Sequence, residues 1–169
     1  MGVSGCGKST VGKLLALRVK GEFLEGDLLH PQRNIDRMAA GIPLTDNDRR
    51  DWLLEIAQQL ADSHASQHAL VVSCSALKRG YRDKLRAASN HLAFVHLDAD
   101  AALLAARMQG RPGHFMPASL LASQLETLEP PGADERAVTF DAAIPAEQVA
   151  ELAAAWLAKL PPPASKSRR

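Results

Sequence analysis

The sequence predicts an α/β fold in which a parallel sheet carries helices on both faces. Short apolar stretches such as 69–73 (ALVVS) and 92–97 (LAFVHL) have the composition of buried parallel strands. Longer stretches of helical periodicity separate them, and strands that alternate with helices form right-handed βαβ units. The length of 169 residues fits a single domain over 1–160, followed by a basic tail, 161–169 (PPPASKSRR), that we expect to be disordered.

The first half of the chain alternates helices with two strands. A leucine-rich run behind Lys8 indicates the first helix, which Gly21 closes. Pro31 and Gly41 are typical of the start and the end of a second helix. Apolar residues spaced by three and four from Trp52 onward indicate a long amphipathic helix. The expected elements are helices over 8–20, 31–40, 46–65 and 79–88, and strands over 22–24 and 69–73.

The second half continues the alternation. Asp100 is placed to cap a helix that ends near Gln109. An alanine-rich stretch with helical spacing predicts the final helix. The expected elements are strands over 92–97 and 137–140, and helices over 100–109, 118–128 and 146–160.

Composition argues against several classes of protein. The 20 Lys and Arg residues against 19 Asp and Glu give a net charge of +1, which offers no electrostatic case for binding nucleic acid or a membrane surface. No apolar run approaches the ~18 residues of a membrane span, and no export signal is recognisable. Two cysteines cannot make a disulfide scaffold. We therefore expect a cytoplasmic protein with no nucleic-acid and no membrane partner.

Residues 2–9, GVSGCGKS, match the phosphate-loop pattern GxxxxGK(S/T) at every fixed position. The glycines let the backbone curl so that its N–H groups point at a polyphosphate, and the following helix adds its positive dipole end. Lys8 can reach the β- and γ-phosphates, and the Ser9 hydroxyl can bind Mg²⁺. The pattern therefore predicts a nucleoside triphosphate site made by Gly2, Ser4, Gly5, Cys6, Gly7, Lys8, Ser9 and Thr10.

A buried strand ordinarily leads into a phosphate loop, but only Met1 precedes Gly2 in this sequence. We expect that strand to lie in the middle of the sheet, between the strands that end at Ser73 and Leu97. Its loss leaves backbone groups of both neighbours unpaired, which is costly. We therefore expect a sheet that lacks its first strand, and a natural chain with about six to ten further apolar residues upstream of Met1.

A second group of motifs follows the predicted strands and fits a phosphoryl acceptor. Glu25 and Asp27 lie two apart at a strand end, so their side chains share one face. One carboxylate can hold Mg²⁺ through water, and the other can orient or take the proton of an attacking hydroxyl. Lys78 and Arg82, just after the strand over 69–73, add cations suited to an anionic acceptor. Solvated loop charges remain the alternative interpretation.

Two arginines four apart, Arg107 and Arg111, lead into a loop rich in Gly and Pro. Such a segment is typical of a mobile lid that brings cations over a transferring phosphoryl group, and we expect the lid at about 107–117. A solvated basic helix end is the alternative interpretation of the same residues.

These motifs, in their order and spacing, resemble those of the short P-loop gluconokinases. The resemblance extends from Gly2 to about Ala158, and its most specific segments are GDxLHP, CSALK and GHF. It implies a three-layer sandwich like that of nucleoside-monophosphate kinases and shikimate kinases. It also implies phosphorylation of D-gluconate on its 6-hydroxyl with ATP and Mg²⁺, by a cytoplasmic homodimer. The motifs are GVSGCGKS, EGDLLHPQRNIDRM, PLTDNDRRDWL, CSALKRGYR, RPGHF and QLETLEPPGADER.

The resemblance also assigns roles to individual residues. It implies catalytic roles for Lys8, Asp27, Arg107 and Arg111, and a metal site at Ser9 and Glu25. Three positions depart from the family pattern: position 25 is Glu where Asp is expected, position 6 is Cys where Ser is usual, and position 112 is Pro where Lys is common. The residues expected to line the gluconate pocket are Asp27, His30, Arg49, Lys78, Arg82 and His114.

Two other functions remain open from the sequence. A shikimate or nucleoside-monophosphate kinase would share the phosphate loop, but the GDxLHP and CSALK segments argue against both. A nucleotide-binding module without turnover would have no need of the acceptor-side residues. A GTPase is disfavoured because no Asn-Lys pair, as in the NKxD motif, occurs in the chain.

Overall fold

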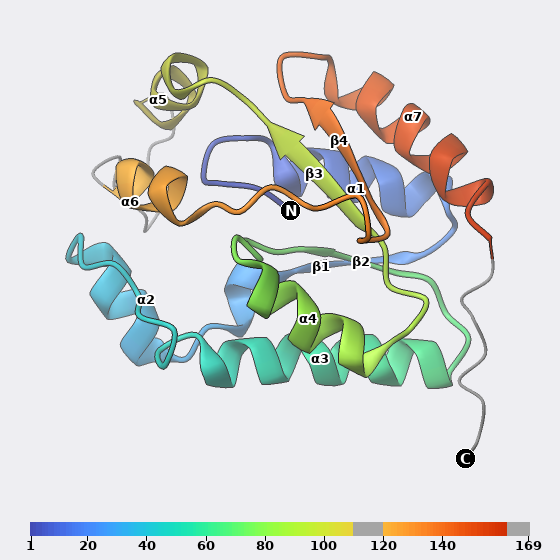
Figure 1. Ribbon diagram of the computed structural model, residues 1–169, viewed down its shortest axis with the longest axis horizontal. Coiled ribbons are helices and arrows are strands. Elements are labelled where there is room, and N and C mark those ends of the chain that lie inside the picture. Colours follow the sequence, from blue (N-terminus) through green and yellow to red (C-terminus); the bar gives the residue numbers. More distant parts are fainter. Residues whose placement is uncertain (110–119, 162–169) are drawn as a thin grey trace.

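The computed structural model describes residues 1–109 and 120–161 and has the expected α/β architecture (Figure 1). The strands are β1 (Glu22–Glu25), β2 (Leu70–Ser73), β3 (Phe94–Asp98) and β4 (Ala137–Asp141). The helices are α1 (Lys8–Arg18), α2 (Gln32–Ala39), α3 (Arg50–Ala65), α4 (Arg79–Ala88), α5 (Ala101–Gln109), α6 (Leu120–Thr127) and α7 (Ala146–Ala158), with a short 3₁₀ helix η1 (Gly26–Leu29).

The helices cover the strands on two sides, which confirms the predicted layers. α3 and α4 pack together along the lower side of the view, and α1 packs against α7 on the other side (Figure 1). Successive residues of β2 divide between the layers, because Val72 packs with the α3 and α4 cluster and Val71 with the α1 and α7 cluster. Side chains that alternate in this way make each strand apolar on both faces, as parallel strands require.

Local chemistry explains the helix boundaries. Asp100 caps α5 as predicted, since its Oδ1 accepts a hydrogen bond from the Leu103 N–H at 2.7 Å. The third helix was expected from residue 46, but α3 begins at Arg50. The reason is a turn in which the Asp48 carboxylate accepts bonds from the Thr45 N–H and hydroxyl at 2.8 and 2.7 Å. Such side-chain bonds offer the backbone an alternative to the helix.

The strands form two parallel pairs, β1 with β2 and β3 with β4. Within the described residues, β2 and β3 belong to different sheets and do not pair with each other. Met1 lies between them: its amino group donates to the Val95 carbonyl, and its own carbonyl accepts from the Leu97 N–H at 3.0 Å. The sheet is therefore interrupted at the place where the sequence predicted a missing strand.

The largest buried side chains come from α3, α4 and the segment between β2 and α4. Trp52 and Leu77 have no exposed surface, and Leu53 and Ile56 are 1% exposed. These residues hold the loops that follow β1 and β2, which carry the predicted acceptor-side residues. None of the helices in the described ranges is long and apolar enough to cross a membrane.

Candidate active site

The phosphate loop curls into the amino end of α1 with its glycines in left-handed backbone conformations. Gly5 and Gly7 have φ angles of 83° and 95°, which residues with a Cβ rarely adopt. A Cβ at Gly5 would also lie 3.2 Å from the carbonyl oxygen of Leu104 on α5. Gly7 caps α1, and its carbonyl accepts the Val11 N–H at 3.0 Å. The loop therefore presents the positive end of α1 to a bound anion.

Two further loop residues are held in place by buried contacts. The backbone N–H of Ser4 donates to Oε1 of Gln124 at 2.7 Å, which ties the loop to α6. Cys6 is 2% exposed and packs in an apolar cluster with Val3 and Leu97. Cys6 therefore replaces the usual serine as a core residue, and its predicted part in nucleotide binding rests on its backbone.

The first turn of α1 carries Lys8, Ser9 and Thr10, all predicted to contact the nucleotide or its metal ion. The Lys8 ammonium donates to the Val3 carbonyl at 2.9 Å, so it lies across the loop. Glu25, at the end of β1, accepts a hydrogen bond from the Ser73 hydroxyl at the end of β2. Since α1 packs against β1 and β2, the predicted metal residues belong to neighbouring elements.

Charges from several parts of the chain act on Cys74, the buried residue that follows β2. Burial is the main cause that raises the pKa of the Cys74 thiol to about 12. Among the nearby charges, Asp27 raises this pKa, whereas Lys8 and Arg49 lower it. Lys8, Asp27 and Arg49 are therefore near enough to act electrostatically on the residue that follows β2, at the end of a strand where α/β proteins bind ligands.

Trp52 fixes the turn that carries Asp27. Its indole N–H donates to the Gly26 carbonyl at 2.7 Å, in a buried contact. Gly26 cannot carry a side chain here, because a Cβ would lie 2.3 Å from the Ser73 carbonyl oxygen. Trp52 also stacks on the His30 ring, with ring centroids 4.3 Å apart. Asp27 is half-buried at the start of η1. Its backbone position is therefore fixed by the contacts of the neighbouring Gly26 with Trp52 and Ser73.

His30 is an uncharged residue of this neighbourhood at neutral pH. Its ring is buried, and burial followed by the nearby Arg49 charge lowers the pKa of His30 to about 4. Nδ1 of His30 lies 3.3 Å from the side-chain nitrogen of Asn34, which also donates to the Asp48 carbonyl at 2.8 Å. His30 can therefore offer hydrogen bonds to an acceptor hydroxyl but brings no charge to an anionic substrate.

Two cations gather around Tyr81 on α4. The Lys78 ammonium lies 5.7 Å and the Arg49 guanidinium 5.8 Å from the centre of its ring. Asp46 accepts hydrogen bonds from Lys78, at 2.7 and 3.0 Å, and from the Tyr81 hydroxyl. These bonds hold the pKa of Asp46 below its usual range. Within the described residues, Nε of Arg49 is buried without a hydrogen-bond partner. The cluster therefore has the charge and the donors to bind a carboxylate.

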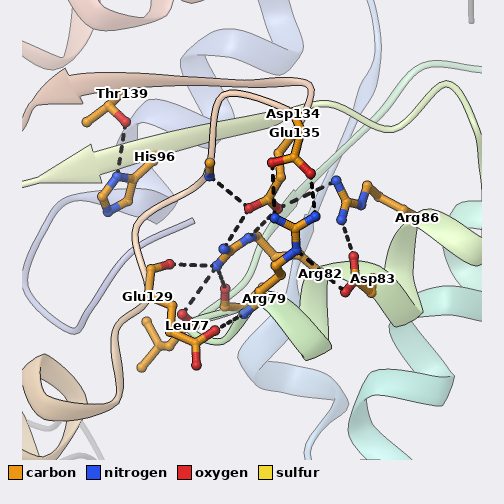
Figure 2. A network of polar contacts seen from close by, with 12 residues as sticks. Leu77, Arg79, Arg82, Asp83, Arg86, His96, Glu129, Asp134, Glu135 and Thr139 are labelled. Atoms are coloured by element: carbon orange, nitrogen blue, oxygen red, sulfur yellow. Dashed lines mark hydrogen bonds and ion pairs between the residues drawn. The ribbon is translucent and has the colours of Figure 1, made fainter.

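Arg82 does not belong to this cluster, although the sequence predicted that it binds substrate. Figure 2 shows its guanidinium enclosed between α4 and the segment before β4. Nε and Nη2 donate to both carboxylate oxygens of Glu135 at 2.7 and 2.9 Å. Nη1 donates to the carbonyls of Ala76, Leu77 and Glu129 at 3.2, 3.2 and 2.9 Å. With 0% of Arg82 exposed, the structure places it in the framework that supports Lys78.

Arg107 lines a cavity of about 360 Å³ beside the phosphate loop. Its Nη2 donates to the Ala142 carbonyl at 2.9 Å, so it joins α5 to the loop after β4. Gly7 and Thr10 form one side of the cavity, and residues 142–146 form the other. The position and size of the cavity fit a nucleotide base and ribose attached to phosphates in the loop.

Some predicted residues cannot be placed in this site. Arg111, His114 and Pro112 lie outside the described residues, as does most of the predicted lid at 107–117. The basic tail beyond residue 161 lies outside them as well.

Four residues that shape the site were not predicted from the sequence. Asp46 and Tyr81 bind Lys78 or its neighbours, Trp52 positions the turn of Asp27, and Glu135 neutralises Arg82. All four lie inside motifs already recognised, PLTDNDRRDWL, CSALKRGYR and QLETLEPPGADER, but the motifs did not show what each residue contacts. The partnership of Arg82 with Glu135 joins residues 53 apart and has no local signal in the sequence.

The fold and the site together define a P-loop kinase for a small anionic acceptor, and comparisons with known proteins identify its family. A family model described as shikimate kinase matches residues 4–149. A gluconokinase of Gluconobacter oxydans is 53% identical over 135 residues, which cover 80% of this chain and 76% of the relative. The thermosensitive gluconokinase of Escherichia coli is 47% identical over 136 residues, with 80% and 73% covered.

Solved structures agree with these relatives. A gluconokinase from Sinorhizobium meliloti superposes with a TM-score of 0.84 at 52% identity, covering 94% of this chain and 89% of that one. A sugar kinase from Janibacter has a TM-score of 0.90 at 46% identity, with 94% and 91% covered. The chain belongs to the gluconokinase family, within the shikimate-kinase group of P-loop kinases.

Proposed function

We propose that this protein transfers the γ-phosphoryl group of ATP to D-gluconate and forms 6-phospho-D-gluconate. The observation that carries the proposal is the cluster of Lys78, Arg49 and Tyr81 at the same end of the sheet as Lys8 and Asp27. A sugar acid has both groups that this arrangement suits: a carboxylate for the cations and a primary hydroxyl for transfer. The gluconokinase relatives support this choice of acceptor.

On the nucleotide side, the amino end of α1 and Lys8 bind and neutralise the phosphates. Arg107 and the cavity between the phosphate loop and residues 142–146 accept the rest of the nucleotide. Little covalent chemistry is required of the protein in phosphoryl transfer, so positioning and charge neutralisation supply most of the rate. Lys8 and Arg107, joined by Arg111, are the residues proposed to stabilise charge on the transferring group.

On the acceptor side, Asp27 orients the attacking hydroxyl and takes its proton. Its half-buried position beside the fixed Gly26 turn supports this role, because a catalytic base needs a defined direction as well as a charge. His30, Arg49, Lys78 and His114 are proposed to bind the rest of the sugar acid.

The residues present fit a nucleotide-bound Mg²⁺. This ion usually keeps several waters and takes one or two protein oxygens besides the phosphates, so Ser9 and Glu25 can suffice. The Ser73 hydroxyl that donates to Glu25 fixes the direction of that carboxylate. Bound there, the ion would neutralise charge on the β- and γ-phosphates.

The resemblance to the family extends the proposal to a cytoplasmic homodimer. Leu28 is 77% exposed and Leu54 is 62% exposed, on η1 and α3, which contact each other. Exposed leucines on adjoining elements support a protein interface there. Sedimentation of the purified protein should give a mass twice that of one chain, and a monomer would contradict the dimer.

Removing Lys78 tests the acceptor side. We expect Lys78→Ala to raise the KM for gluconate roughly 10- to 150-fold, because a charge-assisted bond is worth about 1.5–3 kcal/mol. The KM for ATP should stay unchanged. Asp46→Asn should lower the KM for gluconate. The Asp46 carboxylate is hydrogen-bonded to the Lys78 ammonium and repels an incoming carboxylate, so neutralising it favours the substrate.

Steady-state kinetics with each substrate varied in turn separate these effects. Lys84→Ala, at an exposed lysine of α4, the helix that Lys78 precedes, is the matched control and should leave both KM values unchanged. An effect of Lys78→Ala confined to the KM for ATP would move Lys78 to the nucleotide side and remove the main support for a sugar acid.

A further inference from the structure

Asn34 lies completely buried in the first turn of α2, beside His30, and its side-chain amide forms its contacts through one atom. The amide nitrogen, Nδ2, donates to the Asp48 carbonyl at 2.8 Å and lies 3.3 Å from Nδ1 of His30. The amide oxygen, Oδ1, is buried and has no hydrogen-bond partner among the described residues. Buried polar atoms are normally paired, so the contacts of the nitrogen set the orientation of this amide.

The Asp48 carbonyl determines which end of the amide faces it. A backbone carbonyl only accepts hydrogen bonds, so the Asn34 atom at 2.8 Å from it is the nitrogen. Reversing the amide would place Oδ1 against this carbonyl and would deprive Nδ2 of both its present partners. The Asp48 backbone is itself held in a turn, because its carboxylate accepts bonds from the N–H and hydroxyl of Thr45 and its N–H donates back to that hydroxyl.

The same nitrogen determines the state of the His30 ring. An amide nitrogen carries two hydrogens, and with one on the Asp48 carbonyl the other is left for Nδ1 of His30. Burial, followed by the charge of Arg49, lowers the pKa of His30 to about 4, so the ring is neutral at neutral pH. In a neutral imidazole one nitrogen carries the proton and the other accepts, so Nδ1 accepts here and Nε2 carries the proton.

The second ring nitrogen of His30 is available to a ligand. Nε2 forms no hydrogen bond within the part of the chain that the structure describes. Trp52 stacks on the ring with an interplanar angle of 12°, which fixes the plane of the ring. His30 ends the η1 turn that carries Asp27, and its backbone N–H donates to the Asp27 carbonyl at 3.4 Å. The Nε2–H group therefore lies on the same turn as the proposed base.

We propose that Asn34 is a positioning residue that holds His30 in the Nε2–H tautomer, so that His30 acts on the sugar acid only as a hydrogen-bond donor. The inference rests on the proposed function for the identity of that ligand. The atom that meets Nε2 must then be an acceptor, as the hydroxyl and carboxylate oxygens of D-gluconate are. An acceptor molecule that places carbon at this point leaves the Nε2–H unpaired and is disfavoured.

The tautomer can be measured on the unmodified protein without any substrate. The protonated and the bare nitrogen of a neutral imidazole have well-separated nitrogen-15 chemical shifts, and they couple differently to the ring hydrogens. The chain has six histidines, so the His30 signals are identified as those that His30→Leu removes. At neutral pH we expect the proton on Nε2. A proton on Nδ1 would overturn the inference and would leave the gluconate proposal standing.

Asn34→Asp should move a proton to Nδ1 of His30, because a carboxylate accepts hydrogen bonds and cannot donate one to that nitrogen. The matched control is Asn90→Asp, which makes the same chemical change at an exposed position between α4 and β3 and should leave the His30 signals unchanged. If Nδ1 stayed bare in a folded Asn34→Asp protein, Asn34 would not control the tautomer. If that variant did not fold, the measurement on the unmodified protein would still decide the inference.

A double-mutant cycle tests whether Asn34 acts through His30. Asn34→Leu removes the donor, and we expect it to raise the KM for gluconate about 3- to 10-fold, the range for one hydrogen bond, with the KM for ATP unchanged. In the His30→Leu background the same substitution should have no further effect. An equal rise in both backgrounds would show that Asn34 only supports the fold and would overturn the inference. Absence of gluconate turnover in every form would refute the proposed function, and the nitrogen-15 measurement would still decide the tautomer.

Discussion

Asp27→Asn is expected to abolish most turnover while nucleotide binding survives. The substitution keeps the shape of the side chain and removes the charge that orients the acceptor hydroxyl. General-base catalysis is typically worth roughly 10²–10⁴-fold in rate, so kcat should fall by that factor. The Gly26 turn, held by Trp52, does not depend on this carboxylate and should keep its geometry. Coupled ADP-release kinetics measure kcat, and titration with ATP measures nucleotide binding.

Asp36→Asn is the matched control, because Asp36 lies exposed on α2, nine residues further along the chain. It should leave kcat unchanged. An Asp27→Asn variant with kcat near that of the unmodified protein would show that another group takes the proton.

Arg82→Met is expected to destabilise the fold by about 3–5 kcal/mol, the usual cost of removing one partner of a buried ion pair. Glu135 would remain in the interior, where the Gly132 N–H, at 3.0 Å, and the more distant Arg86 would still face its charge. The bond to Arg82 is the main cause that lowers the pKa of Glu135 to about 2, so the unpaired carboxylate would lose its largest source of stabilisation. Urea unfolding at neutral pH measures the loss.

Two companion variants decide whether the pair itself is responsible. Arg79 lies on the same helix as Arg82 and forms an exposed ion pair with Asp134 (Figure 2). Arg79→Met removes this exposed pair and should have little effect on stability. Adding Glu135→Leu to Arg82→Met should recover most of the lost stability, since no charge is then left buried. A small loss in Arg82→Met alone would return Arg82 to the list of substrate-binding candidates.

Much of the fold could be predicted because the residues that define each helix or strand lie close together in the sequence. The phosphate loop is a contiguous pattern, Asp100 caps the helix that it precedes, and the apolar run at 69–73 is too short for a helix and lies between clear helical segments. The start of α3 could not be predicted by periodicity, because the Thr45 and Asp48 side chains compete with the helix for the backbone.

The sequence indicated which residues could contact a ligand. It did not indicate which residues hold one another in place. The sequence placed Lys8 and Asp27 at the ends of elements that meet, and the structure brings both near Cys74. It did not predict the partner of Arg82, because a cation after a buried strand has the same pattern whether it binds substrate or Glu135. Only the three-dimensional path of the segment before β4 distinguishes the two roles.

The central claim is that the acceptor is a sugar acid, and its most direct test is ADP release measured with a panel of acceptors. The purified protein receives ATP and Mg²⁺ with D-gluconate, shikimate, glycerate or AMP in separate reactions at equal concentrations. We expect ADP release that depends on D-gluconate, with kcat/KM for the other three acceptors lower by orders of magnitude. Preferred turnover of shikimate or AMP, or no acceptor-dependent release at all, would contradict it.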